Sequence, residues 1–195
     1  MLIVDINDDM RLQAEIEAGR REEHIRHHFG VGHMSKEESN VVGFLGEFAC
    51  RKLLGLDWKD GIRKDYLTID NFDIAYKGQR LDVKTETVPQ GKAMQVVNRT
   101  IADDVLYGRR LINEGQWGLL HKYDVVVFGL FVRDWYHRWY AIGYRDTKYL
   151  LANYKPQLER PDGGVYPSAG APVRTSELMG MGELMGGGGI SRLSD

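Results

Sequence analysis

The side chains best suited to chemistry lie in the stretch from Phe72 to Thr85, which reads FDIAYKGQRLDVKT. A glycine at the first of two central positions suits a type II′ turn, so we expect a β-hairpin that reverses at Gly78-Gln79. Side chains alternate between the two faces of a strand, and this register places Asp73 opposite Lys84. Asp82 lies on the same face as both of them. The other face carries an apolar layer for the core: Phe72, Ile74, Tyr76, Leu81 and Val83.

A hairpin face with two carboxylates and a lysine can bind a divalent cation and act on a water molecule beside it. Mg²⁺ prefers oxygen ligands and keeps several waters, so two carboxylates and one backbone carbonyl form a partial coordination shell. A lysine two residues after the second acid could orient that water or help to deprotonate it. The alternative is an ordinary solvent-facing hairpin, on which opposite charges commonly alternate.

A third acid, Glu47, lies in the preceding stretch, which has the pattern of a helix. Ser35, with a glutamate three residues later, matches a capping box, and apolar residues recur at helical spacing until Gly55 offers a stop. Two glycines of the segment GFLGE would let this helix approach other backbone closely. The alternative role for Glu47 is an ordinary surface ion pair with Arg51.

Together these residues resemble the signature of the PD-(D/E)XK nuclease superfamily, which has the restriction-endonuclease-like fold. Asp73 matches the separate acid of that signature, Asp82-Val83-Lys84 matches the acid-any-lysine motif, and Glu47 matches the acid on the helix before the hairpin. The resemblance covers about residues 35–151, and it departs from the family label at Phe72, where the label has a proline. It implies an α/β domain with a mixed central sheet flanked by helices.

The resemblance also implies an activity, which is Mg²⁺-dependent hydrolysis of phosphodiester bonds in DNA. An endonuclease is favoured over an exonuclease, but the sequence leaves both open. Asp73 and Asp82 would bind Mg²⁺, or Mn²⁺ as a substitute, together with the Val83 carbonyl and a direct or water-mediated contact from Glu47. Lys84 would position the attacking water. The main alternative is a nucleic-acid-binding or assembly protein that keeps a nuclease-like fold without turnover, and the third is a purely structural domain that binds no divalent ion.

Hydrophobic periodicity predicts the elements that must position these residues. Alternation and short apolar runs predict strands at three places: Tyr66–Glu86, Val125–Val132 and Arg138–Tyr144. Further helices are predicted at Asn7–Phe29, at Ile101–Asn113, and from a cap at Asp146 or Thr147 to Leu151. The first of these helices has only a thin apolar stripe, so we expect an exposed N-terminal helical extension that packs weakly.

Prolines and glycines gather after residue 155 and predict an irregular C-terminal tail. We therefore divide the chain into a nuclease-like domain at residues 1–155, with its core at about 35–151, and a Pro/Gly-rich extension at residues 156–195. A chain of 195 residues suits one such domain.

Composition narrows the class of protein further. Apolar residues make up 43% and charged residues 28%, as in folded globular domains, and the formal net charge of -2 means that phosphate binding must be local. No apolar run approaches the roughly 20 residues of a membrane span. The acidic N-terminal stretch lacks the pattern of an export signal, and a lone Cys50 suits a buried, reduced thiol. We expect a cytoplasmic protein that contacts DNA and no membrane, with monomer and homodimer both open.

Other clusters have simpler explanations. His24 and His28, with His27 beside them, have a spacing that could hold zinc, but no further ligand motif accompanies them, and a solvated or phosphate-facing helix is favoured. Asp70 falls on the apolar side of the hairpin and ranks below Asp73. The aromatic residues around Trp135 are better explained by packing in a hairpin than by stacking on bases. Helix caps and strand ends account for isolated acids more often than metals do, and this applies to Asp103, Asp104 and Asp124.

Overall fold

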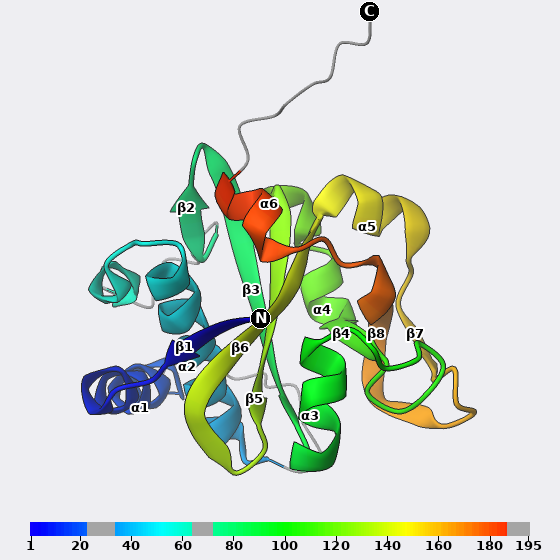
Figure 1. Cartoon of the computed structure of the whole chain (residues 1–195), viewed down its shortest axis with the longest axis horizontal. Coiled ribbons are helices and arrows are strands. Elements are labelled where there is room, and N and C mark those ends of the chain that lie inside the picture. Colours follow the sequence, from blue (N-terminus) through cyan, green and yellow to red (C-terminus); the bar gives the residue numbers. More distant parts are fainter. Residues whose placement is uncertain (23–33, 64–71, 187–195) are drawn as a thin grey trace, which may run out of the picture.

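The computed structural model describes residues 1–22, 34–63 and 72–186, and its central element is a mixed five-stranded sheet with other elements on both faces (Figure 1). The strand order is β1-β6-β5-β3-β2, in which β3 and β5 run parallel and the other neighbours run antiparallel. The strands of this sheet are β1 (Leu2–Asp5), β2 (Ile74–Tyr76), β3 (Gln79–Val88), β5 (Val125–Val132) and β6 (Trp135–Asp146). The mixed α/β class with a mixed central sheet is therefore confirmed.

Helix α2 (Lys36–Leu53) covers one face of this sheet, and α1 (Asp8–Glu22) packs against α2. Fully buried side chains of α2, such as Phe44, Leu45 and Phe48, share a core with Leu81 of β3. Burial of this apolar surface provides the main driving force for placing α2 against the sheet.

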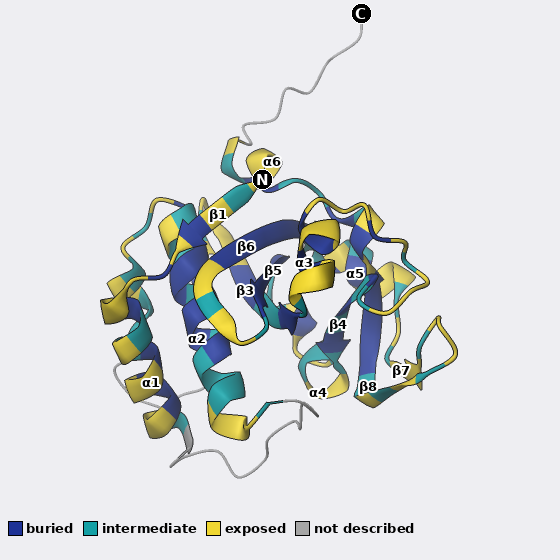
Figure 2. Cartoon of the chain, turned by 60° about the horizontal axis from the view of Figure 1, so that its bottom comes forward, coloured by how far each residue is buried: buried dark blue, intermediate teal, exposed yellow. Residues whose placement is uncertain are grey.

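Helix α1 is not the weakly packed extension that its thin stripe predicted. Met10, Ala14 and Ala18 recur every four residues and are fully buried, whereas Leu12 and Ile16 are exposed. Figure 2 shows the buried side of α1 turned toward α2 and its outer side exposed. Two alanines on one face let the helices approach closely, so a narrow stripe is enough to bury one side of α1.

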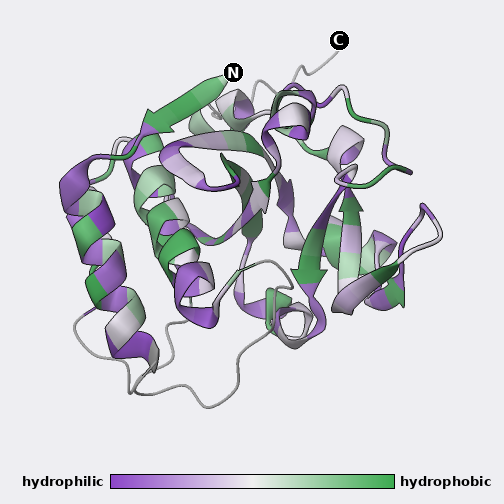
Figure 3. Ribbon diagram, turned by 90° about the horizontal axis from the view of Figure 1, so that it is seen from below, coloured by the Kyte–Doolittle hydropathy of each residue, from purple (hydrophilic) through white to green (hydrophobic). Residues whose placement is uncertain are grey.

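The predicted start and end of α2 are confirmed. The Ser35 hydroxyl accepts a hydrogen bond from the Glu38 N–H (3.0 Å), and the helix stops just before Gly55, which has a φ of +76°. Figure 3 shows α2 hydrophilic at its N-terminal end and more hydrophobic along its middle turns. A side chain at Gly46 would collide with Thr85 of β3, so a glycine is required where this helix meets the sheet.

The second face of the sheet packs against α3 (Gln90–Val97) and a separate three-stranded sheet of order β4-β8-β7. Its strands are β4 (Arg109–Asn113), β7 (Gln157–Glu159) and β8 (Val165–Arg174). Phe128 and Leu130 of β5 share a buried core with Ile112 and Val173 of the small sheet. Short segments complete the described chain: α4 (Glu114–Trp117), α5 (Thr147–Asn153), α6 (Met181–Gly186), and the 3₁₀ turns η1 (Trp58–Gly61), η2 (Leu120–Lys122) and η3 (Thr175–Glu177).

Two predictions fail in this second layer. The helix predicted at residues 101–113 is wrong, because residues 109–113 form β4, in which Arg110 and Ile112 are buried on alternate positions. The irregular tail is wrong for residues 157–186, which contain β7, β8 and α6. Pro172 lies beyond Gly170, where the β7 pairing ends, so one edge of β8 is unpaired at this proline.

Several other elements agree with the sequence. Strand β5 has the predicted bounds, β6 extends its predicted strand at both ends, and Asp146 caps α5 by accepting a hydrogen bond from the Tyr149 N–H (2.8 Å). Cys50 is a buried free thiol, as expected. Strand β1, which pairs with β6, was not predicted. Within residues 1–22, 34–63 and 72–186, no helix is long and apolar enough to cross a membrane.

Candidate active site

The hairpin that carries Asp82 and Lys84 reverses one residue earlier than its sequence predicted. Lys77 and Gly78 form the two-residue turn with φ values of 48° and 78°, and Ala75 pairs with Arg80 rather than with Asp82. Positive φ at both central residues is typical of a type I′ turn, in which glycine favours the second position. The predicted register is therefore wrong by two residues. A shift of two leaves every side chain on its predicted face, because side chains alternate with a period of two.

Asp82 and Lys84 form a buried pair on β3. The Lys84 Nζ donates to the Asp82 Oδ1 at 2.6 Å, and the Asp82 side chain is only 4% exposed. The other carboxylate oxygen, Oδ2, is buried and accepts no hydrogen bond from the described part of the chain. Burying such an oxygen without a partner is costly, so a ligand that contacted the Asp82 Oδ2 would stabilise the folded protein.

Asp73 lies just before β2 and is held by hydrogen bonds to β3 and to α2. Its Oδ2 accepts the Val83 N–H at 2.7 Å, and its backbone carbonyl accepts a hydrogen bond from Arg51 of α2, also at 2.7 Å. Burial raises the pKa of Asp73 well above its usual value, and the negative charges of Glu47 and Asp82 raise it further. Lys84 and the Val83 hydrogen bond oppose this rise only in part.

Glu47 approaches the same place from α2. Its side chain is 12% exposed and forms an ion pair with Arg63 at 3.7 Å, so the alternative of a surface pair with Arg51 is wrong. Burial raises the pKa of Glu47, and the charge of Asp82 adds to the rise. Arg63, Arg21 and Lys84 lower it, but burial has the larger effect.

The fold thus brings the four predicted side chains into one electrostatic cluster, which we call the carboxylate site: Glu47, Asp73, Asp82 and Lys84. Val83, the fifth predicted residue, is buried between Asp82 and Lys84 and binds Asp73 through its N–H. As the side chains stand, no three acidic, histidine or cysteine groups of the described residues form a metal-binding arrangement. Lys84 donates a hydrogen bond to one oxygen of Asp82, and the Val83 N–H donates one to an oxygen of Asp73.

Neither protein-family models nor curated proteins nor solved structures give a significant match to this chain. The assignment of the site therefore depends on its own geometry.

Two residues of this region were missed by the sequence analysis. Arg63 follows η1, and its N–H donates to the buried Glu17 of α1 at 3.1 Å, which places its side chain beside Glu47. Tyr123 lies two residues before β5, and burial with the charges of Asp82 and Asp73 raises its pKa to about 12. Its hydroxyl therefore stays protonated at neutral pH. The position of Tyr123 just before a predicted strand was a usable signal, whereas nothing local pointed to Arg63.

The competing residues that the structure describes have partners outside this site. The histidines at 24, 27 and 28 and Asp70 lie outside the described residues. Asp103 accepts hydrogen bonds from Ser176, and Asp124 forms an ion pair with Arg80 at 3.0 Å. Trp139 is buried in the core and donates to the Thr85 hydroxyl at 3.2 Å, as packing within the sheet predicted, whereas Trp135 is exposed.

Proposed function

We propose that this protein is a Mg²⁺-dependent nuclease that hydrolyses phosphodiester bonds in DNA, with Glu47, Asp73, Asp82 and Lys84 as its active site. The observation that carries the proposal is the buried Asp82 Oδ2, which has no hydrogen-bond partner among the described residues, in a cluster with two further carboxylates. Like charges held together out of water favour a cation between them.

The donor set suits a hard divalent cation. Asp73 and Asp82 would hold the ion with the Val83 carbonyl, and Glu47 would contact it directly or through water. All of these ligands are oxygens, which Mg²⁺ prefers and Mn²⁺ accepts. When bound, the ion would lower the pKa of a water molecule and offset negative charge on the scissile phosphate.

Contacts within the protein hold the catalytic side chains in position. Asp82 holds the Lys84 ammonium at 2.6 Å, which fixes it two residues along the same strand face, where it can orient an attacking water. The Asp73 carboxylate is oriented by the Val83 N–H. Arg63 balances the charge of Glu47. The Tyr123 hydroxyl is a protonated donor near the acids and is available to a phosphate oxygen.

The test is a cleavage assay on linear duplex, single-stranded and branched DNA with Mg²⁺, with Mn²⁺ and with a chelator. We expect metal-dependent cleavage by the wild type that is retained in Lys92→Ala, since Lys92 is an exposed lysine of α3 in the opposite layer. DNA binding without cleavage of any substrate would favour the non-catalytic alternative. Absence of both DNA binding and a response to divalent ions would favour the purely structural one.

A further inference from the structure

A cavity of about 220 Å³ lies on the second layer of the molecule, between α5, β4 and β8. Its lining combines three cations with one acid and two tyrosines: Arg109, Lys155, Arg174, Glu177, Tyr149 and Tyr154. We call it the cationic cavity. None of these residues belongs to the carboxylate site, and all of them lie in the described part of the chain.

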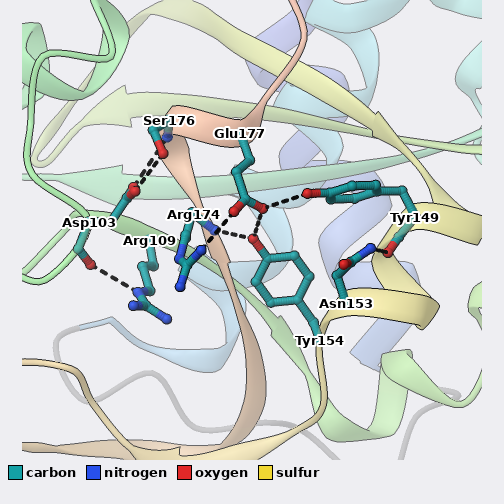
Figure 4. Close-up of polar contacts among 8 residues, drawn as sticks. All are labelled: Asp103, Arg109, Tyr149, Asn153, Tyr154, Arg174, Ser176 and Glu177. Carbon is teal, nitrogen blue, oxygen red and sulfur yellow. Dashed lines mark hydrogen bonds and ion pairs between the residues drawn. The ribbon is translucent and has the colours of Figure 1, made fainter.

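Two of the cations lie directly opposite each other on neighbouring strands of the small sheet. Arg109 of β4 and Arg174 of β8 are cross-strand partners, and Figure 4 shows both guanidinium groups on the same side of the sheet. Like charges directly opposite each other on neighbouring strands destabilise a sheet. The Arg109 Nε donates to the backbone carbonyl of Asp103 at 2.9 Å, which carries no formal charge and so leaves the guanidinium charge in place.

The one acid of the lining already has hydrogen-bond and ion-pair partners within the protein. The Glu177 carboxylate accepts hydrogen bonds from the Tyr149 hydroxyl at 3.1 Å and from the Tyr154 hydroxyl, and it pairs with Arg174 at 2.9 Å (Figure 4). Burial alone would raise the pKa of Glu177, but hydrogen bonds from Tyr154 and Arg174 outweigh it and lower the pKa. Glu177 therefore stays ionised and neutralises one of the three cations of the lining, and Asp103, which lies outside the lining, also attracts Arg174.

We propose that the cationic cavity binds a phosphate monoester group, either the terminal phosphate of a nucleic-acid strand or that of a small phosphorylated molecule. Within the lining, the cations outnumber the acid by two, which suits the dianion. Guanidinium groups bind phosphate through pairs of N–H donors, and the two arginines lie side by side to do so. The cavity is smaller than the 300–1,000 Å³ or so of sites for drug-sized ligands, which suits a phosphate group with little attached to it.

The first test uses inorganic phosphate in the absence of divalent ions, measured by calorimetry and by melting temperature against chloride at equal ionic strength. We expect phosphate to bind the wild type and raise its melting temperature. Arg109→Gln and Arg174→Gln should each weaken binding by roughly tenfold or more, because each removes a charge-assisted pair of hydrogen bonds.

Arg138→Gln is the matched control. Arg138 and Arg174 are both strand residues with side chains 51% exposed, and each forms an ion pair with one acid. Equal phosphate affinity in Arg109→Gln, Arg174→Gln and Arg138→Gln would overturn the proposal. Lys155→Gln repeats the test at an exposed position of the same cavity, in case loss of an arginine prevents folding.

The second test identifies the source of the phosphate. Oligonucleotides with a terminal phosphate are compared with the same strands ending in hydroxyls, and ribose 5-phosphate is the small-molecule probe. A preference for phosphorylated ends that Arg109→Gln abolishes assigns the cavity to nucleic acid, and binding of ribose 5-phosphate without such a preference assigns it to a small molecule. Binding of none of these probes would overturn the proposal. Asp82→Asn should bind phosphate normally, so failure of the proposed nuclease function would be seen separately.

Discussion

The carboxylate site and the cationic cavity each hold like charges together, but they treat their acids in opposite ways. Burial and neighbouring acids raise the pKa of Asp73, whereas hydrogen bonds from Tyr154 and Arg174 lower the pKa of Glu177. The difference lies in the donors. Glu177 accepts hydrogen bonds from two hydroxyl groups and pairs with a guanidinium group. Asp82 keeps one buried oxygen without a hydrogen-bond donor in the described chain. The donors of Glu177 come from the protein itself, whereas the free oxygen of Asp82 is where the proposed ion would bind.

The two regions also differ in how strongly the repulsion between their like charges destabilises the folded protein. The cationic cavity is open to solvent at Lys155 and Arg174, where water and salt screen the repulsion. In the carboxylate site Asp82 is buried and Glu47 and Lys84 are only 12% and 16% exposed, so the repulsion is screened much less. We therefore expect changes in the carboxylate site to have the larger effects.

The largest effect is expected from removing both acids of the hairpin. Asp73→Asn with Asp82→Asn should reduce cleavage at least roughly 1,000-fold, about 4 kcal/mol of activation free energy, because the ion loses its ligands. The rise in melting temperature with Mg²⁺ should disappear, while DNA binding is retained or becomes tighter. Asp124→Asn is the control, since Asp124 is already paired with Arg80. A double variant that still responds to Mg²⁺ would move the metal site elsewhere.

Lys84→Ala should separate chemistry from metal binding. Removing the ammonium leaves all three carboxylates in place, so we expect cleavage to fall by roughly 100-fold or more while Mg²⁺ still raises the melting temperature. Single-turnover cleavage and thermal unfolding on the same preparation measure both. Cleavage at the wild-type rate would remove Lys84 from the mechanism.

A smaller effect concerns stability and pH. The pKa of Asp73 is higher in the folded protein than in the unfolded chain, so its contribution to stability is present at low pH and is lost as the pH rises through the folded pKa. Without divalent ions, Asp73→Asn should therefore melt higher than the wild type at pH 8, by about 2–4 °C for each kcal/mol gained, with a smaller gain at pH 5. Mg²⁺ should reduce the gain. A variant that melts lower at both pH values would contradict the repulsion inferred for this site.

The smallest effect tests how α2 reaches the carboxylate site. A methyl group at Gly46 would collide with Thr85, whereas one at Gly43 would meet open space. Gly46→Ala should cost about 1–3 kcal/mol of unfolding free energy and weaken the Mg²⁺ response, since it moves Glu47 away from β3. Gly43→Ala should gain up to about 1 kcal/mol from helix propensity. Phosphate binding in the cationic cavity should stay unchanged in both variants, and equal stability of the two would contradict the close approach of α2.

The contrast between the two regions also shows what sequence could predict. Alternation placed Asp73, Asp82 and Lys84 on one face, and the Ser35 cap placed Glu47 on a helix before them, because these signals are local. The register failed because Lys77 adopts a positive φ, which a non-glycine residue seldom does and the sequence did not signal.

The cationic cavity could not be predicted by the same means. It depends on pairing residues 109–113 with residues 170–174, about 60 positions apart, and that pairing converted a stretch with a helical pattern into β4. Tertiary contacts override local propensity in such cases. The gathering of prolines and glycines pointed to an irregular tail, although β8 accommodates Pro172 where β7 no longer pairs.

The central claim, that the unsatisfied oxygen of Asp82 faces a divalent ion, can be tested most directly with Mn²⁺. Crystals grown with Mn²⁺ should show an anomalous scattering peak within bonding distance of the Asp82 Oδ2 and of the Asp73 carboxylate, and the peak should be absent from Asp82→Asn crystals. Crystals that bind Mn²⁺ elsewhere on the protein, with no peak at Asp82, would contradict the account.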